Sequence, residues 1–420
     1  MPSGVLVRVQ FRVLQNLTIW WGFFVTSFVQ KKGLEPNGPG GHPYFCAMVQ
    51  GENFGAPSQG KHALSRRDGK PVVIAGPCSA ESRAQVLDAA RQLAAHDHVR
   101  FLRAGLWKPR TRPNSFEGRG AVGLDWLMEA QRETGLQAMT EVATPAHVEA
   151  ALKAGMTALW IGARTTVSPF AVQALADALR GTDLTVLVKN PMHADLKLWM
   201  GAIERMAKSI KGEVGALHRG FSSYGRTDFR NAPMWEIPIA LKAEMPDMAM
   251  LCDPSHIAGR PELLQKVAQR AMNLGMDGLM LESHPDPSVA LSDAEQQIQP
   301  AELHKILSSL DIPTRSLDNS QDHDELEGMR LQIDSVDEQL MQLLSKRMEL
   351  AKSIGVVKHR NRWSLLSVGR WREIIASRTE WGSQLGLSRE FLAKILASVH
   401  EESIRVQGDE ADERRAEQKK

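Results

Sequence analysis

The chain has 420 residues, more than one hydrophobic core usually holds, so we expect two folded units with some unstructured chain besides. Its 51 basic residues nearly balance its 49 acidic ones, which argues against a general nucleic-acid-binding surface or an acidic partner, because those need a strong basic excess. The three cysteines, Cys46, Cys78 and Cys252, contain no CxxC pair and exclude a disulfide framework, so we predict a cytoplasmic protein.

Residues 1–69 are predicted to be an N-terminal extension and linker outside the fold. An apolar run over residues 13–29 lies between basic residues and resembles a signal or anchor segment, which would place the protein outside the cytosol. The run is short, contains Gln15, Asn16 and Thr18, and has no small-residue cleavage site after it. We therefore interpret residues 1–47 as an extension or a misassigned start upstream of Met48, with targeting as the alternative. Residues 32–69 are rich in Gly, Pro, Ser and Asn, which is typical of a linker.

Between Pro71 and Leu310, short apolar β-branched runs alternate with amphipathic stretches of helical period, for example residues 82–95, 145–154 and 261–274. This alternation is typical of a parallel sheet covered by helices. The predicted strands are residues 72–75, 99–103, 137–142, 158–162, 185–189, 214–218, 249–253 and 278–282. Eight βα units in about 240 residues predict a (β/α)8 TIM barrel over residues 70–312.

Reactive residue types follow the carboxyl ends of the predicted strands, where a barrel enzyme builds its site. They are Cys78, Arg103 with Lys108, Glu141, Arg164, Lys189, Arg219, His256 and Glu282. One or two charged residues there would mean little, because strand ends are exposed. A mostly basic set spread over all the strand ends indicates an anion-binding pocket.

Four residues could converge on one divalent cation, because they follow strands that are neighbours around a closed barrel. They are Cys78, His256, Glu282 and Asp293. A thiolate, an imidazole and two carboxylates suit a borderline metal such as Mn, Fe, Co or Zn rather than a closed structural zinc site. Taken singly, each could instead be structural: a small buried thiol, a core histidine or an acidic loop cap.

The basic set mixes guanidinium groups, which bind phosphate and carboxylate bidentately, with lysines, which act as compact point charges. Its members are Arg103, Lys108, Arg110, Arg164, Lys189 and Arg219. This mixture favours phosphorylated small molecules as ligands. One or two members could instead pair with Glu141 and other acids.

These residues stand in eight short motifs that occur in one order along the barrel segment. The motifs are Gly76-Pro77-Cys78-Ser79, Arg103-Ala104-Gly105, Lys108-Pro109-Arg110-Thr111, Gly162-Ala163-Arg164, Lys189-Asn190-Pro191, His218-Arg219-Gly220, Asp253-Pro254-Ser255-His256 and Leu291-Ser292-Asp293. Together they resemble 3-deoxy-D-arabino-heptulosonate 7-phosphate synthase.

The resemblance implies a condensation of phosphoenolpyruvate with erythrose 4-phosphate. Phosphoenolpyruvate would be bound by Arg103, Lys108, Arg164, Lys189 and Arg219, with Gly162 and Ala163 also in the substrate-binding set, and erythrose 4-phosphate by Arg110 and Thr111. Lys108 and Glu141 would be catalytic, Glu141 by orienting the attacking water. The four residues named above would be the metal ligands. The alternative is the related octulosonate 8-phosphate synthase, although Lys108-Pro109-Arg110-Thr111 resembles the signature for the four-carbon sugar.

After a linker at residues 313–322, the chain is predicted to form an all-α domain over residues 323–408, followed by a charged tail over 409–420. Apolar residues at three- and four-residue steps, from Met329 to Ile354, predict one long amphipathic helix over about residues 324–360. Two further helices are predicted near residues 368–382 and 388–407, separated at Gly386. Arg347 and Lys358 fall close to the apolar stripe, where a cation is costly unless it meets an anion.

This three-helix pattern resembles the all-helical type II chorismate mutases, which are usually intertwined dimers. The resemblance implies that Arg347, Lys358, Arg370 and Gln407 bind chorismate, that Arg330 reaches the other subunit's site, and that Lys358 and Gln407 are catalytic. Ser367 and Trp371 depart from the pattern, because some mutases have an aspartate and a glutamate there. Two alternatives stay open: Arg347 and Lys358 could merely extend from a dimer seam, or the domain could be a sensor of chorismate or prephenate that controls the barrel.

Overall fold

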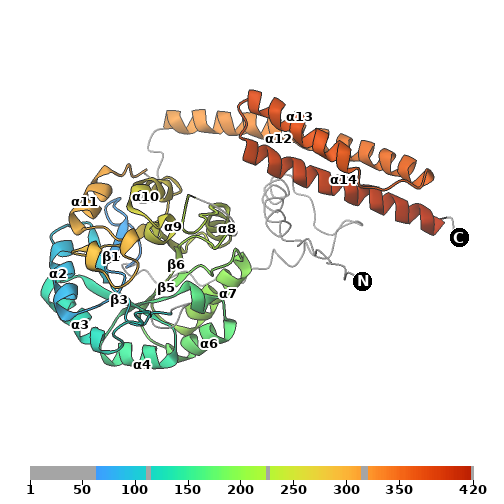
Figure 1. Cartoon of the computed structure of the whole chain (residues 1–420). Coiled ribbons are helices and arrows are strands. Elements are labelled where there is room, and N and C mark those ends of the chain that lie inside the picture. Colours follow the sequence, from blue (N-terminus) through green and yellow to red (C-terminus); the bar gives the residue numbers. More distant parts are fainter. Residues whose placement is uncertain (1–62, 110–114, 224–227, 314–319, 418–420) are drawn as a thin grey trace, which may run out of the picture. The chain divides into compact units, whose positions relative to one another are not determined.

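The computed structural model describes residues 63–109, 115–223, 228–313 and 320–417 (Figure 1). These residues fall into two compact units, a barrel within Pro57–Ser316 and a helical unit that begins after Leu317, and each is described by itself. The predictions for residues 1–62 and for Arg110 and Thr111 lie outside the described residues.

The barrel is a closed sheet of parallel strands in chain order, in which the last strand pairs with the first. Its strands are β1 (Val72–Gly76), β2 (Val99–Arg103), β3 (Gln137–Val142), β4 (Ala158–Ile161), β5 (Thr185–Lys189), β6 (Val214–His218), β7 (Ala249–Cys252) and β8 (Gly278–Glu282). The predicted (β/α)8 barrel is thus confirmed. The strand predictions agree with the structure to within one residue at the ends of β1, β4 and β7.

Helices surround the strands on the outside of the barrel (Figure 1). They are α2 (Arg83–Ala94), α3 (Val122–Thr134), α4 (Pro145–Lys153), α5 (Ala163–Thr166), α6 (Pro169–Ala178), α7 (Leu196–Ser209), α8 (Glu236–Glu244), α9 (Pro254–Ala258), α10 (Leu264–Asn273) and α11 (Pro300–Ser309), with short 3-10 turns η2 (Pro261–Leu263), η3 (Pro287–Val289) and η4 (Ala294–Gln296). Several starts follow local rules: Ser82, Thr144 and Ser168 each cap a helix by accepting a backbone N–H, and Pro145 and Pro169 stand at first helical positions.

The barrel interior is a separate apolar cluster that includes Ile74, Phe101 and Trp160, while the outer faces of the strands pack against the helices. Leu64, which precedes the first strand, is fully buried in this interior cluster. Its N–H donates to Glu213 Oε2 (3.0 Å), and the Arg100 guanidinium donates to the Ala63 carbonyl (2.6 Å). Residues 63–69, predicted to be linker, therefore belong to the barrel, because one buried leucine stabilises the fold by about 1.5 to 3 kcal/mol.

The helical unit consists of α12 (Ser320–Arg360), α13 (Val368–Gln384) and α14 (Arg389–Glu417). Helix α14 packs on both α12 and α13. Gly386, with a φ of 85°, ends α13 in a left-handed conformation that a glycine adopts without strain. The predicted all-α domain is confirmed, but α12 begins inside the predicted linker and α14 runs on through the predicted tail. No helix in the described parts of the chain is both long and apolar enough to cross a membrane.

Candidate functional site

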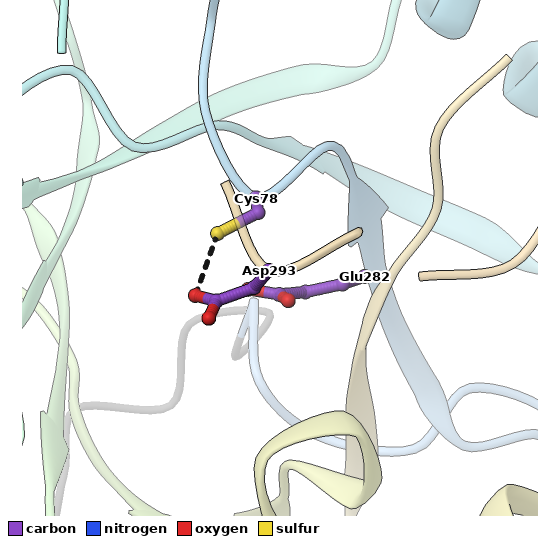
Figure 2. Close-up of side chains that lie close together, drawn as sticks. All are labelled: Cys78, Glu282 and Asp293. Atoms are coloured by element: carbon purple, nitrogen blue, oxygen red, sulfur yellow. Dashed lines mark hydrogen bonds between the residues drawn. The ribbon is translucent and has the colours of Figure 1, made fainter. Parts of the chain in front are cut away.

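Three of the four predicted metal ligands converge at the carboxyl end of the barrel, as Figure 2 shows. Cys78 follows β1, Glu282 ends β8, and Asp293 precedes η4 in a left-handed conformation with a φ of 46°. One ligand atom from each lies within 4.8 Å of those of the other two. The register between β1 and β8 aligns Gly76 with Glu282, so strand pairing brings the thiol and the carboxylate together.

The thiol of Cys78 donates a hydrogen bond to Asp293 Oδ2 (3.3 Å). Burial, followed by the negative charges of Glu282 and Asp293, raises the pKa of Cys78 to about 11. In the absence of a cation the thiol is therefore protonated, whereas a bound divalent cation favours the thiolate. Glu282 Oε1 is buried and accepts no hydrogen bond within the described residues. A cation ligated by both carboxylates and the thiolate would satisfy these groups, so the residues present fit a divalent metal.

His256, the fourth predicted ligand, lies beside this cluster rather than within it. Its Nε2 is 4.0 Å from Glu282 Oε1, and its Nδ1 is 2.8 Å from Asp253 Oδ2. Burial lowers the pKa of His256 against the opposing charge of Asp253, which favours the neutral imidazole that binds metals. A carboxylate on the far ring nitrogen is typical of metal-ligating histidines, because it fixes the tautomer and the ring orientation.

Arg103 and Lys108 place positive charge against the metal ligands. Arg103 is 1% exposed, and its Nη2 is 3.0 Å from Glu282 Oε1. Its Nε and Nη1 are buried and have no hydrogen-bond acceptor in the described chain. Lys108 Nζ donates to the Cys78 carbonyl (2.6 Å) and to Cys78 Sγ (3.0 Å). Buried donors without acceptors are costly, so this arrangement favours an anionic ligand beside the metal ligands.

Lys189 and Asp253 form a second buried ion pair, with Nζ 3.0 Å from Oδ2. Although burial raises the pKa of Asp253, the charges of His256 and Lys189 outweigh it and hold that pKa well below its usual range. Asp253 therefore links a predicted phosphoenolpyruvate ligand to a predicted metal ligand. Sequence reasoning quoted Asp253 in a motif but gave it no role.

Amide side chains hold Arg219 in place and were also missed. The Arg219 N–H donates to Asn190 Oδ1 (2.7 Å), and Arg219 Nη1 donates to Asn231 Oδ1 (2.7 Å). Burial lowers the pKa of Arg219 to about 10, so the group is still charged at neutral pH. A motif contained Asn190, but no sequence signal pointed to Asn231, which lies in a loop outside the motifs.

A further pair of polar side chains, also missed from the sequence, braces the acidic ligands. Arg230 Nη2 is 3.0 Å from Asp293 Oδ1, and Gln296 Nε2 donates to Glu282 Oε2 (2.5 Å). Although burial raises the pKa of Asp293, the positive charges of Arg230 and His256 hold it below its ordinary value. Both carboxylates are thus ionised and oriented at neutral pH.

Glu141, Gly162, Ala163 and Arg164 lie at the ends of neighbouring strands β3 and β4. Glu141 Oε2 accepts a hydrogen bond from Trp160 Nε1 (2.8 Å), which fixes the carboxylate. A Cβ on Gly162 would lie 2.2 Å from Glu141 Oε1, so only glycine fits beside it. Ala163 is buried, whereas Arg164 is exposed. The structure thus places Glu141 against Gly162 and leaves the Arg164 side chain in solvent.

In the helical unit, three predicted residues lie along the contact between α12 and α14. The Arg347 guanidinium donates to the Val399 carbonyl (3.2 Å) and to Ser403 Oγ, and Gln407 Nε2 donates to the Ser403 carbonyl (2.9 Å). Lys358 Nζ donates to the Leu365 carbonyl. Gly355, one turn before Lys358, approaches Gln407 so closely that an added Cβ would lie 3.0 Å from its Cα.

Two other predicted mutase residues do not join this group within one chain. Arg330 is paired with Glu327 (2.5 Å), and Arg370 is paired with Glu373 (2.6 Å). Both arginine side chains are more than half exposed, at 58% and 55%. A position on the surface is compatible with the predicted role of Arg330 in a second subunit, but it does not test that role.

Comparisons with known proteins agree with this division of the chain. Residues 57–317 match the model of the DAHP synthetase I family, and residues 329–408 match that of chorismate mutase type II. A phospho-2-dehydro-3-deoxyheptonate aldolase of Thermotoga maritima is 30% identical over 227 residues, which are 54% of this chain and 65% of that relative. This chain therefore spans slightly less than two thirds of that relative's length.

A crystal structure of phospho-2-dehydro-3-deoxyheptonate aldolase from the same organism superposes with a TM-score of 0.51 at 28% identity, covering 57% of this chain and 68% of that one. A 2-dehydro-3-deoxyphosphooctonate aldolase of Helicobacter pylori is 27% identical over 271 residues, 57% of this chain and 94% of that relative. The octulosonate enzymes are thus related to the barrel, but less similar to it.

Proposed function

This chain belongs to the DAHP synthetase I family, and we propose that its barrel condenses phosphoenolpyruvate with D-erythrose 4-phosphate to 3-deoxy-D-arabino-heptulosonate 7-phosphate and phosphate. The observation that carries the proposal is the convergence of Cys78, Glu282 and Asp293 beside the buried cations Arg103 and Lys108. A mixed thiol and carboxylate set next to unpaired guanidinium donors suits a metal-dependent reaction of a phosphorylated acid.

The family uses a divalent metal, and we propose one ion per barrel, of the Mn, Fe, Co or Zn class, held by Cys78, His256, Glu282 and Asp293. When bound, such an ion polarises a carbonyl oxygen as a Lewis acid, here that of the sugar aldehyde. His256 would need only a small movement to join the other three, because its Nε2 already lies 4.0 Å from Glu282 Oε1. Asp253 would keep the ring in the orientation that presents Nε2.

The remaining chemistry falls to the cations and to Glu141. Arg103, Lys108, Lys189, Arg164 and Arg219 would bind the carboxylate and phosphate of phosphoenolpyruvate, with Gly162 and Ala163 beside them. Its enol carbon attacks the aldehyde, water adds to the resulting cationic carbon, and phosphate leaves. Fixed cations in a dry site stabilise the charge of the transition state without solvent reorganisation. Lys108 stands nearest to the metal ligands and is proposed to be catalytic.

Glu141 is proposed to orient the attacking water. Its carboxylate is held by Trp160 Nε1 (2.8 Å) and closely packed against Gly162. One oxygen of the carboxylate is therefore fixed while the group stays part-exposed. Arg110 and Thr111 are proposed to bind erythrose 4-phosphate, on the strength of their motif alone.

The barrel assignment is tested by phosphoenolpyruvate consumption in the purified, metal-loaded full chain, with erythrose 4-phosphate or arabinose 5-phosphate as acceptor. We expect turnover with the four-carbon sugar that a chelator abolishes and added metal restores. Turnover with arabinose 5-phosphate alone would assign the chain to octulosonate phosphate synthesis instead. No turnover with either sugar, in a sample whose bound metal has been quantified, would refute the enzyme assignment.

For the helical unit we propose the rearrangement of chorismate to prephenate, with Lys358 and Gln407 near the breaking ether bond and Arg347, Arg370 and the partner's Arg330 binding the carboxylates. The reaction is unimolecular, so the site need only hold a compact conformer and stabilise charge. Arg347 and Gln407 share Ser403 as a hydrogen-bonding partner, which supports one pocket. The competing role, a chorismate or prephenate sensor that controls the barrel, requires binding without turnover.

We also propose a homodimer formed through the helical unit. Helix α12 exposes large apolar side chains along its length, among them Leu331 (64%), Ile333 (59%), Val336 (54%), Leu343 (64%) and Leu350 (60%). Monomeric proteins rarely expose so large a continuous apolar surface. The cytoplasmic location stays a prediction.

Sedimentation equilibrium should give twice the chain mass of 46.5 kDa. The double variant Ile333→Glu with Val336→Glu should shift the equilibrium toward the monomer, because it places charges in the apolar seam. Gln342→Glu adds a charge elsewhere on the same helix and should leave the mass unchanged. A monomeric wild-type protein at micromolar concentration would contradict the proposal.

A further inference from the structure

His400 and Trp371, to which the proposed mutase chemistry assigns no role, form a closely stacked pair in the helical unit. Their ring centroids are 4.0 Å apart and their planes are inclined by 13°. Trp371 lies in α13 and His400 in α14, so the stack joins two helices. Trp371 is also one of the two positions at which the sequence departs from other mutases.

The position of His400 along α14 places it on the face that carries the proposed pocket. Ser403 and Gln407 follow it by three and seven residues, which is the spacing of one helix face. Ser403 and Gln407 are bonded to each other, and Ser403 accepts from Arg347. The charges of Arg347 and Lys358 both act on the imidazole of His400. His400 therefore borders the site formed by these residues.

Two buried polar atoms on this face make no hydrogen bond within the described chain: His400 Nε2 and Gln407 Oε1. Buried polar groups are almost always paired in folded proteins, so two unpaired atoms beside a pocket indicate a ligand that pairs with them. Burial, together with the positive charges of Arg347 and Lys358, lowers the pKa of His400. The imidazole is thus neutral at neutral pH and suits an uncharged hydrogen-bonding partner.

We propose that His400 contacts the ligand of the helical unit, its Nε2 hydrogen-bonding an uncharged oxygen, a hydroxyl or an ether, of a cyclic dicarboxylate. The ligand's carboxylates are bound by Arg347 and Lys358. Trp371 is a positioning residue, because the stacked indole fixes the plane of the imidazole. The inference rests on the proposed function of the helical unit and adds a residue that determines its specificity.

Trp371 takes on a new meaning in this arrangement. An acidic residue at this position would add a charged acceptor, whereas the indole supplies a flat apolar surface. Stacked rings of this kind restrict rotation about the terminal side-chain torsion of histidine, which is otherwise broad. The hydrogen-bonding group is then supplied by α14 rather than α13.

The test uses the full chain, with prephenate binding measured by calorimetry and chorismate turnover by absorbance. His400→Phe keeps an aromatic ring against Trp371 but removes both nitrogens, and we expect the prephenate Kd and the chorismate KM to rise about tenfold. His400→Gln restores a hydrogen-bonding group and should recover part of the affinity. Trp371→Leu should raise the Kd about threefold, because the imidazole stays but loses its orientation. Arg347→Ala serves as the control for loss of ligand charge pairing.

The outcomes separate this inference from the function on which it rests. Wild-type affinity in His400→Phe, with turnover intact, would overturn the role of His400 and leave the mutase. Binding that depends on His400, without turnover by the wild type, would support the inference and make the unit a sensor. A wild type that neither binds nor turns over would remove both. Nitrogen-15 NMR decides the contact if His400→Phe unfolds, because prephenate must shift the Nε2 resonance of His400.

Discussion

Replacing Cys78 with alanine is expected to lower barrel turnover by about a thousandfold or more, which corresponds to several kcal/mol of lost transition-state stabilisation. The Cys78 sulfur is one of three ligand atoms that lie within 4.8 Å of one another, and alanine removes it without adding bulk. Lys108 Nζ, which donates to that sulfur, also loses a partner. The measurement is the kcat of phosphoenolpyruvate consumption alongside the metal content per chain.

Cys252→Ala provides the matched control, because Cys252 is a second buried free cysteine, at the end of β7 and outside the ligand cluster. This variant should keep its metal and its turnover even if it loses some stability through the removed sulfur. If Cys78→Ala retained both the metal and the wild-type kcat, the ligand set proposed for the barrel would be wrong.

Replacing Asp253 with asparagine is expected to destabilise the barrel by about 3 to 5 kcal/mol, because it leaves one partner of a buried ion pair without its counter-charge. Asp253 is fully buried, 3.0 Å from Lys189 Nζ and 2.8 Å from His256 Nδ1. Turnover should also fall by about 10- to 100-fold, since His256 loses the carboxylate that orients it. Urea unfolding monitored in the absence of substrate gives the first quantity and steady-state kinetics the second.

The difference between wild type and variant should depend on pH in a defined direction. The folded-state pKa of Asp253 is depressed below its unfolded value of about 3.9, so the stabilisation is present above that value and is lost only as the pH falls through the folded-state pKa. The difference should therefore stay constant from pH 7 to pH 5. Asp195→Asn, at an exposed helix N-cap where asparagine substitutes well, should change stability by less than about 0.5 kcal/mol. Equal effects of the two substitutions would refute the role of the buried pair.

The two active units have features that depend on contacts across long sequence separations. Lys189 and Asp253, Arg230 and Asp293, and Trp371 and His400 are each pairs whose members stand far apart in the sequence. Neither member of such a pair has a local pattern that announces the other. Leu64 shows the same limit for the fold, because its neighbours in sequence look like a linker and only the closed barrel provides the apolar interior that buries it.

The sequence by itself determined the order and extent of the strands and helices, because periodic burial leaves a local pattern, and it determined which residue types stand at the strand ends. It therefore predicted the barrel, the helical unit and three side chains that meet beside Arg103 and Lys108. Only the tertiary structure decided which side chains support them, namely Asp253, Asn231, Arg230 and Gln296, and that His256 lies beside the cluster. The reason is physical: burial follows from the nature of each residue, whereas a hydrogen-bonding partner depends on where the closed barrel places residues that are distant in sequence.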